Sequence, residues 1–491
     1  MHRRPAGGRS LPASTLRELG RLRPILARAG YDERGLDERV RGGDRLSAPE
    51  GLAALRLRPE ADEPASVLVR LFLAGETLDE PLVAAALAPL AAPDLPELLS
   101  VRDGTVRARV RLEPFDGLVV ASDPPRRLRS AHVVGVGVAT KLLAAVTVRR
   151  RVESALDLCT GSGALALLAA RHAERVVGVD LNPRALRLAQ VNAALNGVAN
   201  VEWLAGDLFE PVTAETFDLV VANPPFIVSP DREFLYRDGG QEDDALSRAV
   251  VEGAAARLRD GGFAHILCSW IPPARGDWSK PLRAWVRASG CDALLLRQRD
   301  DSPAAYALRW NLRPGGTYAA AAAAAERWLD YYAARGIEAI ATGLVILRRR
   351  SGRNWVRTDE LPRMPIGAAG GHVERVFAAE DLLRALPDER ELLALKLVAA
   401  PRTMLVERRE PSGTFKRGRL AVEEGLPLPG RLSEACLEVV RALDGTRSLG
   451  EAVDLARGRA GDSLVDECLP AIRTLLANGL LVCPTTLWSS S

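Results

Sequence analysis

The chain has 491 residues, of which 47% are hydrophobic, and its formal net charge is +3 at pH 7. This length suits about three domains of ordinary size, and so small a net charge excludes a strong whole-molecule field that would attract nucleic acid. No apolar run reaches the roughly 18 residues that a membrane helix needs, so we expect no membrane contact.

Cysteine and histidine usage gives no sign of a metal site. The six cysteines lack any C-x-x-C spacing, and the five histidines are scattered. We therefore expect reduced core thiols, no bound metal and a cytoplasmic location. Arginine supplies 62 of the 66 basic residues, a bias typical of GC-rich bacterial coding sequences.

Residues 1–124 are predicted to form a small helical or winged-helix-like domain. Apolar periodicity predicts helices over 14–29, 65–74 and 78–87, and β-rich runs over 106–112 and 118–120. Helices followed by a hairpin suit a domain that recognises substrate. They suit equally well a cap that only packs on the next domain.

Residues 125–358 are predicted to form the catalytic domain. The predicted elements are strand 155–158, helix 163–171, strand 175–179, helix 183–196, strand 201–204, strand 217–222, helix 244–258, strand 263–269 and helix 319–334. Strands separated by helices predict right-handed crossovers and a parallel sheet. Two later runs, 338–347 and 354–357, are joined by Ser351-Gly352-Arg353 and predict an antiparallel hairpin at the sheet edge.

Residues 359–491 are predicted to form a third domain. Short β-like runs lie at 404–407 and 420–423, and three helices and a short strand fill 431–483. The segment 431–483 is winged-helix-like, and such modules bind nucleic acid or protein.

Two polar motifs stand where apolar strands stop, which is where an open α/β sheet binds its ligand. The first is a turn containing Gly161 and Gly163, whose lack of a Cβ lets the backbone approach a ligand closely. The second is Asp180, placed 23 residues after Asp157, a spacing that suits an acid accepting from ribose hydroxyls. These motifs alone fit a nicotinamide-binding domain equally well.

A third motif, Asn223-Pro224-Pro225-Phe226, resolves that ambiguity. In this order the three motifs resemble the class I S-adenosylmethionine-dependent methyltransferases, in the branch with an (Asn/Asp)-Pro-Pro-(Tyr/Phe) motif. That branch includes protein-glutamine N5, adenine N6 and methyltransferase-small enzymes. The resemblance covers about residues 130 to 270. It implies an α/β, Rossmann-like domain with a mostly parallel seven-stranded sheet, here flanked by two small domains, and S-adenosylmethionine as cofactor.

The resemblance also assigns residues to the site. It implies cofactor contacts by Asp157, Thr160, Gly161, Gly163, Asp180, Leu181, Asp207, Leu208 and Asn223, and a catalytic role for Asn223, Pro224, Pro225 and Phe226. Cys159 stands where the family pattern has its first glycine. Some protein-glutamine methyltransferases share this Asp-Leu-Cys-Thr-Gly-Ser-Gly sequence.

The Asn-Pro-Pro-Phe motif suits transfer to a planar amino nitrogen, whose lone pair is delocalised. The side-chain oxygen of Asn223 and the carbonyl of Pro224 can accept its two N–H groups and orient the nitrogen. Pro224 and Pro225 offer no competing N–H, and Phe226 offers a face for stacking. No metal is needed.

The sequence leaves the methyl acceptor open between a glutamine side chain of a translation protein and an exocyclic amine of rRNA or tRNA. The Asp-Gly-Gly loop at 238–240 favours glutamine, whereas Phe226 in place of Tyr favours a base. A natural-product N-methyltransferase is the alternative. A binding module without catalysis and a dehydrogenase are weaker interpretations, and the oligomeric state is not determined.

Overall fold

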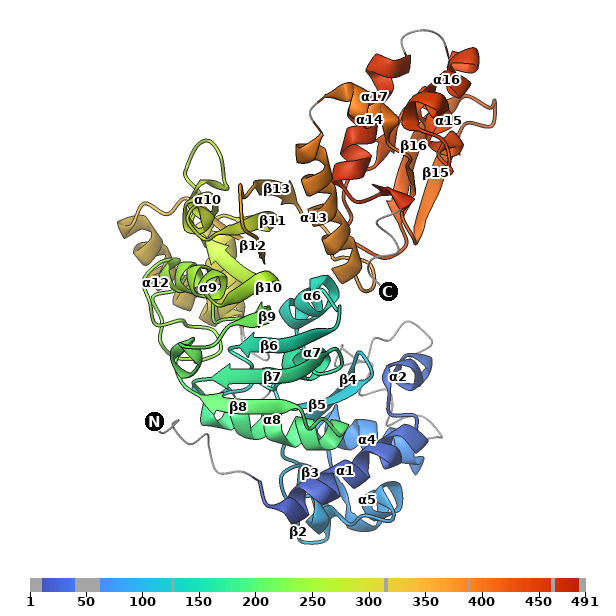
Figure 1. Cartoon of the computed structure of the whole chain (residues 1–491). Coiled ribbons are helices and arrows are strands. Elements are labelled where there is room, and N and C mark those ends of the chain that lie inside the picture. Colours follow the sequence, from blue (N-terminus) through green and yellow to red (C-terminus); the bar gives the residue numbers. More distant parts are fainter. Residues whose placement is uncertain are drawn as a thin grey trace. The chain divides into compact units, whose positions relative to one another are not determined.

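The computed structural model describes residues 11–39, 62–125, 128–312, 317–386, 388–460 and 464–484. Contacts divide the chain into two units (Figure 1). Unit 1 combines Met1–Leu143 with Arg151–Glu360, and unit 2 combines Ala144–Arg150 with Leu361–Ser491. The helix α6 (Val138–Val146) crosses from the first unit into the second. The boundaries predicted at residues 124 and 358 stay predictions.

Unit 1 is built on a central sheet with the order β13-β11-β12-β10-β9-β6-β7-β8. Its strands are β6 (Val152–Leu158), β7 (Ala173–Asp180), β8 (Val201–Ala205), β9 (Phe217–Ala222), β10 (Leu258–Trp270), β11 (Cys291–Asp301), β12 (Ile340–Arg349) and β13 (Val356–Glu360). Strands β6 to β10 are mutually parallel, and β12 runs antiparallel to both of its neighbours. The α/β, Rossmann-like prediction is therefore confirmed.

The strand order reverses at β6. From there β7 and β8 extend the sheet on one side, and β9 and β10 extend it on the other. Such a reversal opens a crevice at the carboxyl ends of the two central strands, where ligands bind in open α/β sheets. The turns after β6 and β9 border this crevice.

Helices cover both faces of the sheet. Figure 1 shows α7 (Ala164–Ala169) and α8 (Pro183–Asn196) on one face, and α9 (Ala245–Ala256) and α10 (Lys280–Val286) on the other. Side chains of α9 and α10, such as Val250 and Leu282, join the strands in one buried cluster. The boundaries predicted for α8 and β9 match those observed.

Two predictions about the sheet edge were wrong. Within the described residues the sheet has eight strands instead of seven. The runs at 338–347 and 354–357 do not pair as a hairpin, because β11 lies between β12 and β13. Seven of the ten residues of β12 are buried, so it needs a hydrogen-bonded neighbour on each side, and β10 and β11 supply them.

The N-terminal part of unit 1 is a lobe of helices and short strands. Its described helices are α1 (Ala13–Arg28), α2 (Glu33–Arg39), α4 (Pro64–Phe72) and α5 (Glu80–Leu87). Its strands are β1 (Thr77–Asp79), β2 (Leu99–Arg102), β3 (Thr105–Ala108), β4 (Arg111–Phe115) and β5 (Leu118–Ser122). The single run predicted at 106–112 is two strands, which join different sheets.

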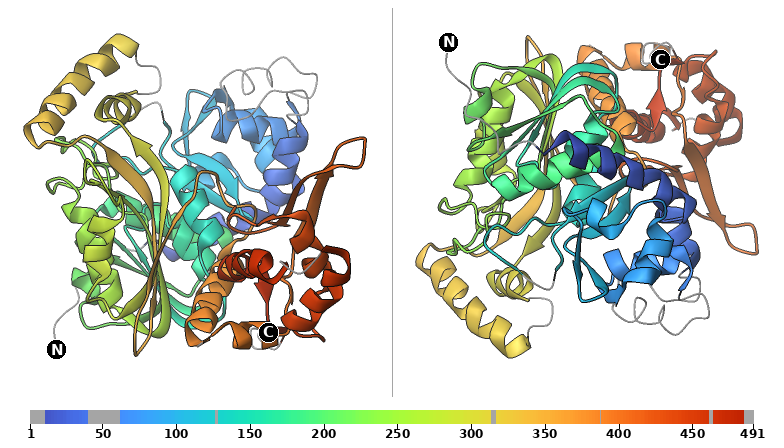
Figure 2. Two further views of the ribbon diagram at one scale, coloured as in Figure 1. Left: turned by 90° about the horizontal axis from the view of Figure 1, so that it is seen from above. Right: turned by 90° about the horizontal axis from the view of Figure 1, so that it is seen from below.

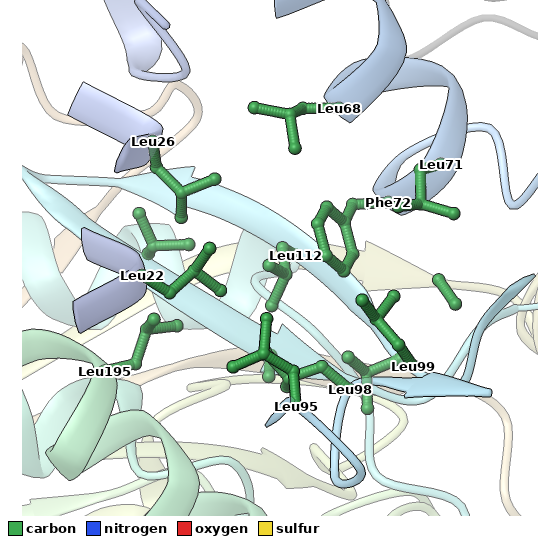
Figure 3. Packing of buried hydrophobic residues seen from close by; sticks show 14 of the residues in the cluster. Leu22, Leu26, Leu68, Leu71, Phe72, Leu95, Leu98, Leu99, Leu112 and Leu195 are labelled. Carbon is green, nitrogen blue, oxygen red and sulfur yellow. The ribbon is translucent and has the colours of Figure 1, made fainter. Parts of the chain in front are cut away.

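The lobe shares its hydrophobic core with the catalytic sheet's helix α8. Figure 3 shows Leu22 and Leu26 of α1 pointing toward the same core as Leu112 of β4 and Leu195 of α8. All four leucines are at most 1% exposed. The lobe is therefore continuous with the catalytic fold.

Two asparagines of α8 bind the backbone of β5 as a neighbouring strand would. Asn192 accepts from Ala121 N (2.7 Å) and donates to Ala121 O (2.9 Å). Asn196 repeats the pattern with Val119, at 2.9 and 2.8 Å. Both side chains are buried. Because buried backbone groups must be paired, these amides fix the lobe against α8.

Unit 2 contains a three-stranded sheet and a group of helices. The helices are α13 (Gly370–Ala385), α14 (Glu389–Ala394), α15 (Glu434–Ala442), α16 (Leu449–Ala460) and α17 (Leu464–Ala477). The strands are β14 (Val398–Ala399), β15 (Thr403–Arg409), β16 (Phe415–Val422), β17 (Arg431–Leu432) and β18 (Leu481–Val482). The three helices predicted within 431–483 are present. The β15–β16 hairpin precedes these helices, and β18 pairs with β14.

Candidate functional site

The motif residues meet at the carboxyl ends of four adjacent parallel strands. Asp157 lies near the end of β6, Asp180 ends β7, Asp207 follows β8 and Asn223 follows β9. The four strands are neighbours in the order β9-β6-β7-β8. The sheet therefore brings together at one edge all the motifs that the sequence singles out.

Asp157 is a buried carboxylate with one unsatisfied oxygen. Its side chain is 2% exposed. Oδ2 accepts from Thr160 Oγ1 (2.5 Å) and from Ala166 N (2.9 Å), whereas Oδ1 has no hydrogen-bond partner among the residues that the structure describes. Burial, helped by the nearby Asp180 carboxylate, raises the pKa of Asp157 to about 7. An orphaned buried oxygen of this kind is costly in a protein without ligand.

The two glycines of the turn serve different purposes. Gly161 has φ +56° and nothing lies within 4 Å of the position of a Cβ, so the space beside it is open. Gly163 has φ +81°, and a Cβ there would lie 2.8 Å from the Trp203 ring and 3.0 Å from Ala189. Gly161 thus leaves room for a ligand, and Gly163 allows the turn to pack on β8 and α8.

Cys159 adopts a left-handed backbone conformation, with φ 56°. This conformation explains why the family pattern has glycine here. Burial raises the pKa of the Cys159 thiol, with the neighbouring carboxylates adding to the effect. Cys159 is thus a neutral thiol that contributes packing and no nucleophile.

Asp180 holds the turns on either side of it. Oδ2 accepts from Gly161 N (2.8 Å) and Oδ1 from Asn182 N (2.8 Å). Burial raises the pKa of Asp180. Each oxygen has a further lone pair. The next side chain, Leu181, is 57% exposed, so an apolar surface lies beside this acid.

The residues after β8 form an open turn. Asp207 is exposed, and its carbonyl accepts from Glu210 N (3.0 Å). Leu208 is half-buried with φ 46°.

Asn223 is half-buried, and within the described residues its side-chain amide makes no hydrogen bond. The carbonyl of Pro224 accepts from Phe226 N (2.8 Å), which closes a tight turn and leaves one lone pair free. Phe226 is half-buried and packs against a cluster that includes Tyr306 and Trp328.

An ionic network, which sequence reasoning missed, holds the loop that follows this motif. Arg237 is 3% exposed and donates to both oxygens of Asp238, at 2.7 and 3.1 Å, and to Asp231 (3.2 Å). Trp328 donates to Asp231 (2.9 Å), and its ring lies 5.3 Å from the Arg237 guanidinium. Trp328 belongs to α12 (Tyr318–Ala334), almost 100 residues away, so no local pattern could reveal the contact.

A second loop, residues 128–137, lies beside the first. Leu235 N donates to Ser130 O (3.0 Å), and Asn182 Nδ2 donates to Ala131 O (3.0 Å). The His132 and Tyr236 rings lie 5.8 Å apart. Hydrogen bonds therefore link this segment both to the turn after β7 and to the loop after β9.

The described residues offer neither a metal-binding cluster nor a membrane-spanning helix. No group of three or more His, Cys, Asp or Glu side chains in that part of the chain could hold a metal ion. Among the same residues, no helix is both long and apolar enough to span a bilayer.

The arrangement fits a cofactor that carries a cation, a ribose and a planar base. The orphaned Oδ1 of Asp157 suits an ammonium group, and the free lone pairs of Asp180 suit ribose hydroxyls. The exposed Leu181 suits the face of a base, and the open space at Gly161 admits the ligand. All these groups lie at or just after the carboxyl ends of β6 and β7.

The chain resembles known methyltransferases in sequence. The profile of the methyltransferase small domain matches residues 133–270. The release factor glutamine methyltransferase of Geobacter sulfurreducens is 33% identical over 195 residues, which are 35% of this chain and 66% of that protein. The enzyme of that name from Mycolicibacterium smegmatis is 37% identical over 191 residues, 34% of this chain and 66% of the relative.

Other matches cover less of the relative or are distant. The ribosomal protein uL3 glutamine methyltransferase of Xanthomonas campestris is 37% identical over 106 residues, 21% of this chain and 34% of that protein. The chain thus spans between about one third and just under two thirds of these curated relatives. Among solved structures, Trm5b from Pyrococcus abyssi has a TM-score of 0.30 at 16% identity, covering 51% of this chain and 62% of that one.

The profile match spans the turn after β6, Asp180 and the Asn-Pro-Pro-Phe motif, and the strand order agrees with the fold that the motifs predict. The chain therefore carries a class I S-adenosylmethionine-dependent methyltransferase domain, and residues 133–270 are similar to the methyltransferase small domain.

Proposed function

We propose that this protein uses S-adenosylmethionine to methylate the side-chain amide nitrogen of a glutamine in a protein of the translation machinery, in the cytoplasm. The observation that carries the proposal is Asn223. Its amide is free of hydrogen bonds within the described residues and stands on a proline-stiffened turn at the crevice. The relatives named for release factors and ribosomal protein uL3 favour a protein glutamine over an RNA base.

The residues of the chain act on the acceptor by positioning it. The Asn223 oxygen accepts one N–H of the acceptor amide, and the free lone pair of the Pro224 carbonyl accepts the other. Both bonds strengthen as the nitrogen becomes more positive during transfer, so they favour the transition state over the ground state. The exposed part of the Phe226 ring supports the planar amide by stacking.

The cofactor supplies the methyl group as an electrophilic sulfonium. Asp157, Asp180 and the open side of Gly161 would hold its amino-acid and ribose parts. Asp207, Leu181 and Leu208 would border the base, and Thr160 and Gly163 would fix the turn. The Arg237 network keeps the loop after Phe226 in place beside the acceptor.

The test is methyl transfer from tritiated S-adenosylmethionine by the full chain into lysate of a strain that lacks the gene. We expect label that protease removes and RNase does not, and that base hydrolysis releases as methylamine. Label removed only by RNase would establish an RNA base as acceptor instead. Label in neither fraction would favour a natural-product substrate.

A variant pair makes the test specific to Asn223. Asn223→Ala should lower turnover by roughly 100-fold or more while leaving cofactor affinity nearly unchanged, because its bonds serve the reacting nitrogen. The control is Arg248→Gln, on the exposed face of α9, which should match wild type. A large loss of cofactor affinity in Asn223→Ala would contradict the assigned role.

A further inference from the structure

Unit 2 carries an exposed sheet face that presents four arginines together. In the sheet β15-β16-β17, Arg408 is paired with Arg417, and Arg419 with Arg431. Residues directly opposite share a face, and so do residues two apart on one strand. Arg417 and Arg419 are two apart on β16, so all four side chains lie on one face, here called the arginine face. All four are exposed.

The opposite face of the sheet is the one that packs. A Cβ on Gly418 would lie 2.9 Å from Leu437 of α15. Leu420 and Leu432, which share a face with Gly418, are 2% and 6% exposed and belong to the core of unit 2. The arginine face is therefore the outer face, and the β15–β16 hairpin projects beyond the helices of its unit (Figure 2).

The four arginines have no carboxylate partner within the part of the chain that the structure describes. Other arginines of the unit do have one: Arg409 pairs with Glu434 (2.7 Å), Arg441 with Glu438 (2.5 Å) and Arg447 with Asp444 (3.2 Å). Residues 361–491 contain slightly more acidic than basic side chains. The positive charge of this face therefore results from where the arginines lie on the sheet, because the unit as a whole has no excess of basic residues.

Such an arrangement destabilises the isolated sheet. Like charges directly opposite on neighbouring strands repel, with Cβ atoms about 5 Å apart, and this sheet has two such pairs. A polyanion laid across the face would remove the repulsion and gain charge-assisted bonds to four guanidinium groups.

The spacing of the array favours one strand of nucleic acid over an acidic peptide or a duplex. Arginines two residues apart along β16 are separated by about 7 Å, and arginines paired across strands by about 5 Å. Both spacings are smaller than the width of the major groove of a DNA duplex, which is roughly 12 Å. The array therefore suits successive phosphates of one extended strand. The other side chains of the face include Met404, Val406 and Ala421. They offer neither the aromatic anchor that dominates protein interfaces nor a platform for base stacking, so the contact would be to the phosphates alone.

We propose that the arginine face binds the phosphate backbone of single-stranded RNA. The choice of RNA over DNA rests on the proposed function, because a translation protein that carries the acceptor glutamine meets RNA. Methyl transfer is measured separately. If the wild type fails to bind RNA but still transfers methyl groups to protein, the RNA-binding proposal is wrong and the proposed function stands.

The test measures binding of the full chain to fluorescein-labelled polyuridylate by anisotropy, between about 50 and 200 mM salt. The variant R408Q/R417Q/R419Q/R431Q should lower the slope of log affinity against log salt by up to about 2.8, since each phosphate contact to a single strand contributes about 0.7. Affinity at the lowest salt should fall at least about tenfold.

The matched control is R384Q/R409Q/R441Q/R447Q, which removes the same charge from ion-paired arginines of the same unit. It should keep the wild-type slope, and circular dichroism should show that both variants are folded. An equal loss of slope in the two variants would overturn the proposal. So would competition by polyglutamate as effective as that by unlabelled polyuridylate. In lysate, RNase and not DNase should abolish ultraviolet cross-linking of nucleic acid to the wild type.

Discussion

Asp157 should make the cofactor-free protein less stable as the pH rises, and Asp157→Asn should remove that dependence. The carboxyl is 2% exposed, and burial raises its pKa to about 7, against about 3.9 in an unfolded chain. Between these values the folded protein binds more protons than the unfolded chain. The free energy of unfolding therefore falls as the pH rises from about 4 to 7, and the loss is complete above pH 7.

The size of the effect follows from the difference of about 3 pKa units. At 1.36 kcal/mol per unit, ionised Asp157 costs the folded protein about 4 kcal/mol at pH 8. An asparagine oxygen can still accept from Thr160 and Ala166, as Asp157 Oδ2 does. The amide carries no charge, so the variant should be more stable than wild type by up to about 4 kcal/mol at pH 8 and nearly equal to it at pH 4.

The assay is urea unfolding of wild type and Asp157→Asn from pH 4 to 8.5, followed by circular dichroism. Asp330→Asn, an exposed position on α12, is the control and should show no pH-dependent difference. Wild-type affinity for S-adenosylmethionine should rise with pH through about 7 and be weaker in Asp157→Asn, since the ionised acid would bind the cofactor's ammonium group. A stability difference that stays constant with pH would refute the reasoning.

Three more predictions follow from the same geometry. Asp180→Asn should weaken S-adenosylmethionine binding roughly 10- to 150-fold by calorimetry, because charged acceptors contribute about 1.5 to 3 kcal/mol per bond; unchanged affinity would exclude ribose contact. Both glycines have positive φ, so alanine at either position should cost about 1 to 2 kcal/mol of stability. Gly163→Ala should cost about 1 to 3 kcal/mol more through its clash with Trp203, whereas Gly161→Ala should add a loss of cofactor binding; equal effects of the two on both readouts would contradict the roles assigned. Asn192→Ala should cost about 2 to 4 kcal/mol in urea unfolding, because it leaves the buried amide and carbonyl of Ala121 unpaired, and a loss below 1 kcal/mol would mean that water replaces the bonds.

Local signals made much of the catalytic sheet predictable. The helix α8 has Asn182 as an N-cap accepting from Arg184 N (3.0 Å), Pro183 in its first turn and Gly197 as a left-handed C-cap. These end signals fix both boundaries. Strand β9 is an apolar run that stops at Asn223-Pro224, where the prolines prevent continuation.

The sheet edge was not predictable in this way. The first half of β11 is buried and its second half is charged and more exposed, so it shows neither the alternation nor the apolar run of a typical strand. Its place between β12 and β13 depends on pairing between residues that are 39 to 63 positions apart. The contact between Asp231 and Trp328 is equally non-local. The site residues share strand ends and could be inferred, whereas the loop that faces the acceptor depends on tertiary packing.

The pairing of Asn192 and Asn196 with β5 limits how this methyltransferase could have exchanged parts during evolution. A chain beginning at residue 125 would lack β5, leaving two asparagine side chains with unused donors and acceptors beside the apolar Leu188 and Val191. Such a fragment would tend to aggregate. A related protein could acquire this lobe by recombination only if the helix equivalent to α8 had side-chain amides at the positions of Asn192 and Asn196, or gained them afterwards. In this chain the fit between the lobe and α8 therefore depends on these two asparagines.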